Sequence, residues 1–328
     1  MNKNSEVFKL ANKVCEKTGV PEKKIIDFLF FLKNGEPIEN NELVRKLGVS
    51  KNVLNQIKEF FIAYLKAPSK NTELSTLGMK TFENCFHKNY QTEETLWKFL
   101  EDDMYLKNLE LLQRYQDKRP KANREFDQFI ATSETTARRA SLLNFFEDLK
   151  DKRILFLGDD DFTSVAAANY KESSDITVLD IDDRMLGGIN FFSEKEDLKI
   201  VTSHYDARKK LPSRFVKKFD VVFTDPPYTK EGVGLFTSRA IESLDLSNKS
   251  ARIYICYGNS DRAKERFLPI YEEFNLSGFM TRWVFDKFNR YNGAESIGSS
   301  STLFILNTTS KTKPLINGNY DKPIYTNN

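Results

Sequence analysis

The spacing of apolar residues changes partway along the chain. Up to about residue 115, apolar residues recur at helical intervals, as in SEVFKLANKVCEKTG (5–19) and PEKKIIDFLFFLKNG (21–35), and both segments stop at a glycine. This spacing places apolar side chains on one face of a helix, and glycine is typical of a helix end. The first third of the chain is therefore predicted to be mostly α-helical.

Residues 40–65 combine a short helical pattern, a turn at Gly48 and a longer helical pattern. The segment that follows, TELSTLGMKTFEN (72–84), is predicted to form a small β wing. A helix–turn–helix followed by such a wing is typical of winged-helix domains. We expect a winged-helix-like N-terminal domain over residues 1–115, followed by a basic linker, residues 116–133, that contributes to the site of the next domain.

From about residue 134 the chain alternates short apolar runs with helical stretches. The runs are rich in β-branched residues and almost continuously apolar, as expected of strands buried on both faces of a parallel sheet. They are RILFLG, DITVLDID, LKIVTSHYDA, FDVVFTDPPYT, ARIYICYG and SSTLFIL. The pattern predicts an α/β class fold, a Rossmann-like doubly wound sheet of the methyltransferase type, over residues 134–310. The tail, residues 311–328, is polar and expected to be mobile.

Composition narrows the function classes. The 328 residues carry 50 basic and 47 acidic side chains, a net charge of +3, so no global field indicates a nucleic-acid or membrane partner. Three distant cysteines and two histidines suggest neither a disulfide framework nor a metal site. No apolar run approaches the roughly 18 residues of a membrane span, and the N-terminal segment lacks the apolar core of a signal peptide. We therefore expect a cytoplasmic protein.

Acids follow four consecutive predicted strands. Asp159–Asp161 come after the first strand, Asp180 and Asp182 close the second, Asp206 follows the third, and Asp225 follows the fourth. Ligands of open α/β sheets bind outside the carboxyl ends of the strands. Any one of these acids alone would also suit a helix cap or a turn. Together they favour a site.

The acid that ends the second strand has a known use in nucleotide-binding folds. A carboxylate there accepts both ribose hydroxyls, which is the role we expect for Asp180, while Asp182 is expected to cap the following helix. Asp206 is predicted to accept a hydrogen bond from an adenine amino group. The loop Gly158–Asp161 completes the expected nucleoside side of the site, with Gly158, Asp159 and Asp161 as binding residues.

The segment DPPYT, Asp225–Thr229, is the most specific short motif. Its prolines fix the backbone, so that Asp225 presents its acceptor oxygens beside the face of Tyr228. A carboxylate beside an aromatic face suits a nucleophilic amine, because the carboxylate accepts the N–H and the ring stabilises an ammonium. This motif resembles the signature of amino-group methyltransferases, in which a nitrogen attacks the sulfonium of S-adenosylmethionine. It is also compatible with a turn without chemistry.

The loop GDDD, Gly158–Asp161, has acids where nucleotide-binding loops usually have further glycines. Three aspartates would repel the carboxylate of S-adenosylmethionine. A decarboxylated donor, whose chain ends in an ammonium, would be attracted, and so would a polyamine acceptor. The attacking nitrogen of a polyamine is normally protonated, so a carboxylate that helps to remove the proton is chemically required.

These residues resemble the branched-chain polyamine synthases, that is N(4)-bis(aminopropyl)spermidine synthases. The resemblance rests on GDDD, on DID at Asp180–Asp182, on DPPYT and on the segment REFDQFIATSETTARRA (124–140), and it covers residues 115–235 well. It implies a winged-helix-like domain joined to a Rossmann-like domain that transfers aminopropyl groups from decarboxylated S-adenosylmethionine, a co-substrate that is not tightly bound, to spermidine. It also implies a homodimer.

The resemblance implies particular site residues. An aspartate of GDDD, Asp160 or Asp159, accepts the proton from the attacking amine, with Asp225 as a further catalytic acid. Asp127 is implied as another acid, so that the substrate-binding set becomes Asp127, Asp160, Asp225, Pro226 and Tyr228. The family has tyrosine where this chain has Phe126, so a hydroxyl contact is absent there.

Two other functions compete with this one. A winged helix with a DPPY site would suit an S-adenosylmethionine-dependent methyltransferase acting on amino groups of DNA or RNA. Against it stand the acids of the donor loop and a recognition helix with few basic residues, so nucleic acid is not the expected partner. A non-enzymatic regulator that senses a polyamine is the third reading, and the intact DPPYT argues against it.

Overall fold

The structure is a computed structural model that describes residues 6–18, 20–82, 85–86, 90, 92–171, 175–258, 264–294 and 298–326. The chain divides into two compact units, each with its own apolar core. The first unit comprises Met1–Phe99 together with Asn259–Lys264 and Arg290–Ser300. The second comprises Leu100–Gly258, Glu265–Asn289 and Ser301–Asn328.

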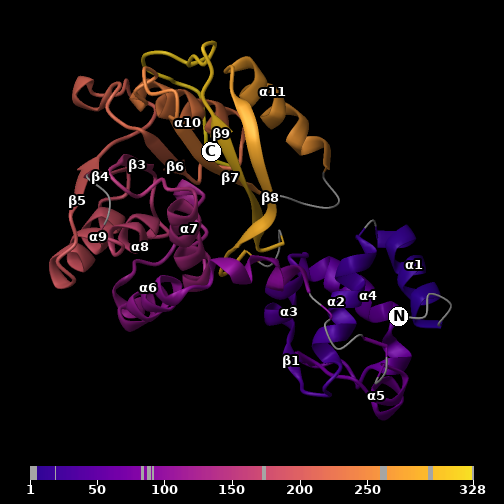
Figure 1. The fold of residues 1–328 in the computed structure, drawn as a ribbon. Coiled ribbons are helices and arrows are strands. Elements are labelled where there is room, and N and C mark those ends of the chain that lie inside the picture. Colours follow the sequence, from indigo (N-terminus) through magenta and orange to yellow (C-terminus); the bar gives the residue numbers. More distant parts are fainter. Residues whose placement is uncertain are drawn as a thin grey trace. The chain divides into compact units, whose positions relative to one another are not determined.

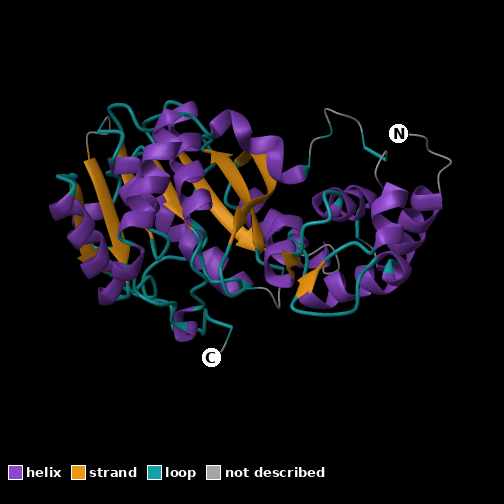
Figure 2. Ribbon diagram, turned by 90° about the horizontal axis from the view of Figure 1, so that it is seen from below, coloured by secondary structure: helices purple, strands orange, loops and turns teal. Residues whose placement is uncertain are grey.

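The first unit is mostly helical, as predicted (Figure 2). Its helices bury an apolar face in a common core that includes Phe28, Leu43, Leu54 and Phe82. The α-helices are α1 (Glu6–Thr18), α2 (Glu22–Leu32), α3 (Asn40–Leu47), α4 (Lys51–Phe60) and α5 (Thr76–Phe82), and the 3-10 helix η2 (Glu93–Leu100) follows at the end of the unit.

A helix–turn–helix is present, but the β wing differs from the prediction. Gly48 ends α3 in the left-handed conformation, with φ of 60°, and Ser50 caps α4. Two short strands, β1 (Ile38–Glu39) and β2 (Asn71–Thr72), pair antiparallel. The prediction of a wing over residues 72–84 is wrong for its central part, because α5 occupies Thr76–Phe82 and buries Phe82 in the core.

The second unit contains the doubly wound sheet. In the described residues the sheet has seven strands in the order β5-β4-β3-β6-β7-β9-β8. The strands are β3 (Arg153–Leu157), β4 (Asp175–Asp180), β5 (Ile200–His204), β6 (Val221–Thr224), β7 (Arg252–Gly258), β8 (Met280–Arg290) and β9 (Ser300–Asn307). The helices are α6 (Asp103–Arg114), α7 (Ser133–Phe145), α8 (Thr163–Ala168), α9 (Asp183–Lys195), α10 (Lys230–Ser243) and α11 (Leu268–Leu276).

The parallel part of the sheet determines where its ligand edge lies. Strands β4, β3, β6 and β7 run parallel, with Leu157 of β3 paired with Leu179 of β4 and with Thr224 of β6. The carboxyl ends of β4, β3 and β6 therefore lie side by side. Figure 1 shows α8 and α9 on one face of the sheet and α10 and α11 on the other, the layering of a doubly wound fold.

Two segments pack differently from the sequence-based expectation. Helix α6 precedes residue 115, the expected end of the first domain, yet it packs on α7 within the second unit. The expected mobility of residues 311–328 is wrong for the described part of the tail. Ile324 and Tyr325 are buried in the core of the second unit, and Arg239 donates a hydrogen bond to the carbonyl of Gly318.

Among the residues that the structure describes, every helix is too short or too polar to cross a bilayer.

Candidate active site

The acids predicted at the strand ends come together at the carboxyl ends of β3, β4 and β6. Strand β3 lies between the other two, so the loop Gly158–Asp161 is flanked by Asp180 on one side and Asp225 on the other. Hydrogen bonds join the three loops: the backbone N–H of Asp159 donates to Asp180 Oδ2 at 2.8 Å, and Thr224 Oγ1 donates to the carbonyl of Leu157 at 2.7 Å. The central part of the predicted cluster is therefore one connected site.

Gly158 starts the loop with a backbone conformation that favours glycine. Its φ is 73°, and its N–H donates to the carbonyl of Leu179 at 2.8 Å. The left-handed turn reverses the chain at the end of β3, so that the aspartates lie over the edge of the sheet.

Asp159 and Asp161 are both buried and both engaged with the protein. Asp159 accepts the backbone N–H groups of Thr163, at 2.8 Å, and Ser164, at 3.1 Å, and so caps the first turn of α8. Burial raises the pKa of Asp159 to about 7 although these hydrogen bonds oppose the rise. Asp161 accepts the N–H of Ala131 and forms an ion pair with Arg139. Both carboxylates therefore hold the loop in place.

Asp160 differs from its two neighbours. It is partly exposed, and within the part of the chain that the structure describes its carboxylate accepts no hydrogen bond from another residue. Although the residue is partly exposed, desolvation by the surrounding protein raises its pKa well above the ordinary value, and the negative charges of Asp161, Asp225 and Asp180 raise it further. A carboxylate with a raised pKa and without a bound donor is suited to accept a proton.

Asp180 occupies the expected position at the end of β4. Its two oxygens each accept one backbone N–H, from Asp159 and from Asp182, both at 2.8 Å. Each oxygen keeps a second lone pair for a hydroxyl. Burial raises the pKa of Asp180 to about 6. Asp182 caps α9, as predicted, and forms an ion pair with Arg184.

Asp206 lies beside this cluster but has a different environment. Arg208 donates its backbone N–H and its guanidinium to the carboxylate, at 2.9 Å for each of the two shortest contacts. Burial alone would raise the pKa of Asp206, but the Arg208 hydrogen bonds and charge outweigh it, so that the pKa is lowered. The expected adenine contact would therefore use a carboxylate that is already held by an arginine.

The DPPYT corner pairs Asp225 with Tyr228 through the tyrosine hydroxyl, whereas the sequence analysis expected the carboxylate beside the ring face. The hydroxyl of Tyr228 donates to Asp225 Oδ1 at 3.2 Å, and Pro226 is buried beneath the turn. The ring of Tyr228 lies against Gly258, where a Cβ atom would be 2.8 Å from Cδ2 of the ring. A side chain at residue 258 would therefore displace the ring of Tyr228, a role for Gly258 that the sequence analysis did not identify.

Asp127 contacts the tail of the chain. It ends the 3-10 helix η4 (Arg124–Phe126) with φ of 55°. Its carboxylate accepts the backbone N–H of Thr326 at 2.7 Å and also the hydroxyl of that residue. Beside it, the rings of Phe126 and Tyr325 lie 5.8 Å apart. In this structure Asp127 therefore anchors the tail rather than joining the acids of the GDDD loop.

Two arginines belong to the site although the sequence reading missed them. Arg139, from α7, donates to Asp161 Oδ2 at 2.6 Å and to Asp225 Oδ2 at 2.8 Å. Arg119 donates to the backbone carbonyl of Asp161 at 3.0 Å. For Arg139 the signal in the sequence was the pair of arginines, Arg138 and Arg139, within the otherwise small and mostly uncharged pattern of TTARRASLL (135–143), since a charge on a buried helix face needs a partner.

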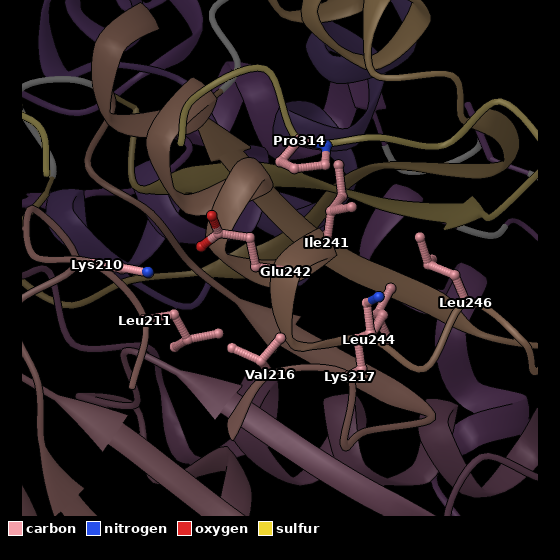
Figure 3. Close-up of a pocket in the computed structure, with 9 residues that line it drawn as sticks. All are labelled: Lys210, Leu211, Val216, Lys217, Ile241, Glu242, Leu244, Leu246 and Pro314. Atoms are coloured by element: carbon pink, nitrogen blue, oxygen red, sulfur yellow. The ribbon is translucent and has the colours of Figure 1, made fainter. Parts of the chain in front are cut away.

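Other candidate sites carry less chemistry. Within the described residues, His, Cys, Asp and Glu side chains form no group of three that could hold a metal ion. A pocket of about 240 Å³ lies between the segment after β5 and the end of α10 (Figure 3). Its walls are mostly apolar, and they include Leu211, Val216, Ile241 and Leu244 but none of the predicted site residues.

The mixed sheet with acids at its parallel strand ends places the second unit among the α/β methyltransferase-like Rossmann proteins. A putative RNA methyltransferase of Pyrococcus horikoshii shares this fold, with a TM-score of 0.50, 12% identity, and coverage of 63% of this chain and 100% of that one. Residues 108–322, more than half of the chain, match the model of the branched-chain polyamine synthase A C-terminal domain. The chain belongs to the branched-chain polyamine synthase family.

Sequence comparison finds two kinds of relative, an uncharacterized protein and synthases with a named activity. An uncharacterized protein of Methanocaldococcus jannaschii is 32% identical over 99% of this chain and 84% of its own length. The N(4)-bis(aminopropyl)spermidine synthase of the same organism is 34% identical, and that of Thermococcus kodakarensis 36% identical. These two matches cover 52% and 51% of this chain, and 51% and 46% of the respective synthases, so this chain spans only about half the length of each.

A solved structure has the same fold over nearly the whole chain. The branched-chain polyamine synthase of Thermus thermophilus, in complex with N4-aminopropylspermidine and 5'-methylthioadenosine, aligns with a TM-score of 0.65 at 21% identity. The alignment covers 97% of this chain and 96% of that one.

Proposed function

We propose that this protein is an aminopropyltransferase. It moves the aminopropyl group of decarboxylated S-adenosylmethionine to the secondary amine of spermidine, giving N(4)-aminopropylspermidine, N(4)-bis(aminopropyl)spermidine and methylthioadenosine. Membership of the branched-chain polyamine synthase family supports the reaction type. The ligands in the Thermus thermophilus structure support a polyamine acceptor and a donor that leaves methylthioadenosine.

The observation that carries the proposal is the excess of acid around Asp160. Two guanidinium groups, of the half-buried Arg119 and the buried Arg139, face five neighbouring carboxyl groups. The five belong to Asp159, Asp160, Asp161, Asp180 and Asp225. With every acid ionised the cluster carries a net charge of −3, from two positive and five negative groups. Such a site attracts a donor with a sulfonium and an ammonium, and it repels a donor that keeps its carboxylate.

The proposed chemistry assigns one step to each part of the site. Asp160 accepts the proton from the central nitrogen of spermidine, and the freed lone pair attacks the aminopropyl carbon bonded to sulfur. The carbon–sulfur electron pair moves to sulfur, which leaves as neutral methylthioadenosine, and the positive charge moves to the new tertiary ammonium. Asp225 accepts a hydrogen bond from the acceptor, while Pro226 and Tyr228 form the wall that contacts its methylene groups.

The donor is proposed to bind along β3, β4 and β5. Asp180 accepts the ribose hydroxyls, for which its position and its two remaining lone pairs are suited. Asp206 accepts the adenine amino group, while Asp159 and Asp161 keep the loop after Gly158 shaped for the aminopropyl chain. Asp127 is proposed to contribute through the tail that it holds.

The identity of the acceptor needs a test of its own, because a relative that matches over almost the full chain is uncharacterized. Purified protein would be incubated with decarboxylated S-adenosylmethionine and with spermidine, spermine or a shorter triamine in separate reactions. Mass spectrometry then counts aminopropyl additions and chromatography measures methylthioadenosine. We expect product with spermidine, formed at least 100-fold more slowly by Asp160→Asn. Methyl transfer from S-adenosylmethionine to DNA or RNA, without aminopropyl transfer, would instead support the methyltransferase alternative.

We also propose a homodimer that uses the edge strand β8. Trp283 and Val284 are 44% and 46% exposed on this strand, and Phe146 packs against Trp283 with ring centroids 5.6 Å apart. An exposed apolar edge of this kind is typical of an interaction surface. Light scattering should give twice the monomer mass for the wild type, and Val284→Lys should give the monomer mass. A monomeric wild type would contradict this proposal.

A further inference from the structure

Arg139 lies between two of the acids and bridges them. Its side chain is 1% exposed. Nη1 donates to Asp161 Oδ2 at 2.6 Å, and Nη2 donates to Asp225 Oδ2 at 2.8 Å. Asp161 belongs to the loop after β3 and Asp225 to the corner after β6, so one guanidinium, supplied by α7, joins the GDDD and DPPYT motifs.

The guanidinium is held in one orientation. Its Nε donates to Asn289 Oδ1 at 2.7 Å, and Asn289 in turn donates from Nδ2 to Ser301 Oγ at 2.8 Å. Because the amide nitrogen is used on Ser301, its oxygen faces the arginine. The ring of Phe223 lies 5.3 Å from Cζ and covers one side of the guanidinium. These contacts from β6, β8 and β9 leave the arginine little freedom to turn away from the acids.

We propose that Arg139 is a positioning residue that neutralises Asp161 and Asp225 and thereby leaves Asp160 as the carboxylate that accepts the proton. This inference rests on the proposed aminopropyl transfer. Of the three acids in the loop, Asp159 is used on backbone N–H groups and Asp161 on Arg139. Among the described residues the carboxylate of Asp160 forms no hydrogen bond or ion pair, and it interacts with the guanidinium of Arg119 only through its charge. The arginine thus separates structural acids from the reactive one.

The charge of Arg139 has a direct consequence for Asp160. Asp161 and Asp225 are, after burial, the first two influences that raise the pKa of Asp160. A guanidinium bonded to both compensates their charge. Without it, Asp160 would be ionised only at higher pH, and the acceptor amine would lose its base at neutral pH. Asp225 would also lose its tether to α7, so Tyr228 would lose its fixed partner.

A purely structural role would predict something different. Buried ion pairs often only hold elements together, and removing one partner then lowers stability without changing the pH dependence of turnover. Arg239 provides a matched control in the same unit. It is also fully buried, and it donates to Glu242 Oε2 at 2.9 Å and to the carbonyl of Ala207 at 2.8 Å, but it bonds to none of the five acids.

The test compares wild type, Arg139→Gln, Arg139→Lys and Arg239→Lys by kcat, KM and melting temperature from pH 6 to pH 10. For Arg139→Gln we expect kcat at pH 7 to fall at least 100-fold and the rising limb of the kcat profile to move to a pH higher by about 1. Arg139→Lys keeps the charge but reaches one carboxylate, so its kcat should fall about tenfold with a smaller displacement. It also serves as the test if Arg139→Gln does not fold.

For Arg239→Lys the melting temperature should fall while the rising limb stays in place. The inference is overturned if the Arg139 variants keep the wild-type limb and lose activity only in proportion to unfolded protein. A wild type without aminopropyl transfer would refute the proposed function instead. In that case the pH dependence of stability tests the role of Arg139. The loss of stability in Arg139→Gln relative to wild type should be larger at pH 8 than at pH 5. An equal loss of stability at both pH values would refute the neutralising role.

Discussion

Asp180 Oδ2 accepts the backbone N–H of Asp159 at 2.8 Å, so the acid that ends β4 fixes the first acid of the loop after β3. The contact joins the proposed ribose position to the proposed proton acceptor through one residue of backbone. It also means that neighbouring aspartates in one short motif have different tasks. Asp159 and Asp161 hold the loop, and the side chain between them is left for chemistry.

This division predicts opposite effects for two adjacent substitutions. Asp160→Asn removes the proposed base and a carboxylate that burial and neighbouring charges disfavour, so kcat should fall at least 100-fold while the melting temperature does not fall. Asp159→Ala removes the cap of α8 and should lower the free energy of unfolding by about 1 kcal/mol. Steady-state kinetics and thermal unfolding of both variants check this. If Asp159→Ala is as stable as wild type and Asp160→Asn is less stable, the structural and catalytic assignments of the two acids must be exchanged.

The gathering of the acids could be predicted because it follows from parallel strand topology alone. Four apolar runs that each end in aspartate must place those ends along one edge, and Asp159, Asp180 and Asp225 do lie there. The mostly helical N-terminal part and the Rossmann-like sheet were predicted correctly for the same reason, since helical and strand periodicities differ strongly.

Other features depend on long-range contacts that no local pattern encodes. Arg139 meets Asn289 and Asp225, 150 and 86 residues away along the chain. Strand β8 was not predicted, because MTRWVFDKFNR mixes charged and aromatic residues as an edge strand with an exposed surface can. The tail looked mobile because two buried residues, Ile324 and Tyr325, are hidden in an otherwise polar sequence.

The contact between Tyr228 and Gly258 predicts a graded pair of variants. Tyr228→Phe loses the hydroxyl bond to Asp225 but keeps the ring, so kcat/KM should fall only about three- to tenfold, as expected for one hydrogen bond. Gly258→Ala places a Cβ 2.8 Å from the ring and must displace it. We expect a loss of at least tenfold more in kcat/KM, measured with spermidine. Equal activities of the two variants would mean that the ring position is unimportant.

The raised pKa values of Asp159, about 7, and Asp180, about 6, predict pH-dependent binding. Both acids take up a proton as the pH falls below these values, and a cationic ligand binds better to the ionised forms. Spermidine should therefore bind more weakly at pH 5 than at pH 8, and binding at pH 6 should release protons. Calorimetry in two buffers of different ionisation enthalpy measures the released protons. Neutral methylthioadenosine serves as the control and should show a weaker pH dependence.

The ion pair between Arg153 and Asp220 shifts a pKa in the opposite direction, downward. Arg153 donates to Asp220 from its backbone N–H, from Nε and from Nη2, at 2.8–3.0 Å, and its hydrogen bonds lower the pKa of Asp220 to about 2. A lowered pKa adds stability above the ordinary value near 4, and this is lost as the pH falls to 2. Asp220→Asn should cost about 1–2 kcal/mol in urea unfolding at pH 7, after allowing for partial solvent screening. The difference from wild type should shrink between pH 4 and pH 2.

The polar composition of the tail predicts mobility, whereas the structure packs the tail on the second unit. This difference can be tested. Ile324 is 1% exposed in the core of the second unit, and its carbonyl accepts the hydroxyl of Thr229, the residue that caps α10. Ile324→Ala should therefore lower the free energy of unfolding by about 2–4 kcal/mol.

Leu315, in the same tail but 37% exposed, is the matched control, and Leu315→Ala should cost no more than about 1 kcal/mol. Chemical unfolding followed by circular dichroism measures both. Because a mobile tail contributes no buried surface, equal and small effects at both positions would mean that residues 315–326 do not pack on the domain in solution. A large effect at Ile324 alone would show that the tail packs in the core of the second unit in solution.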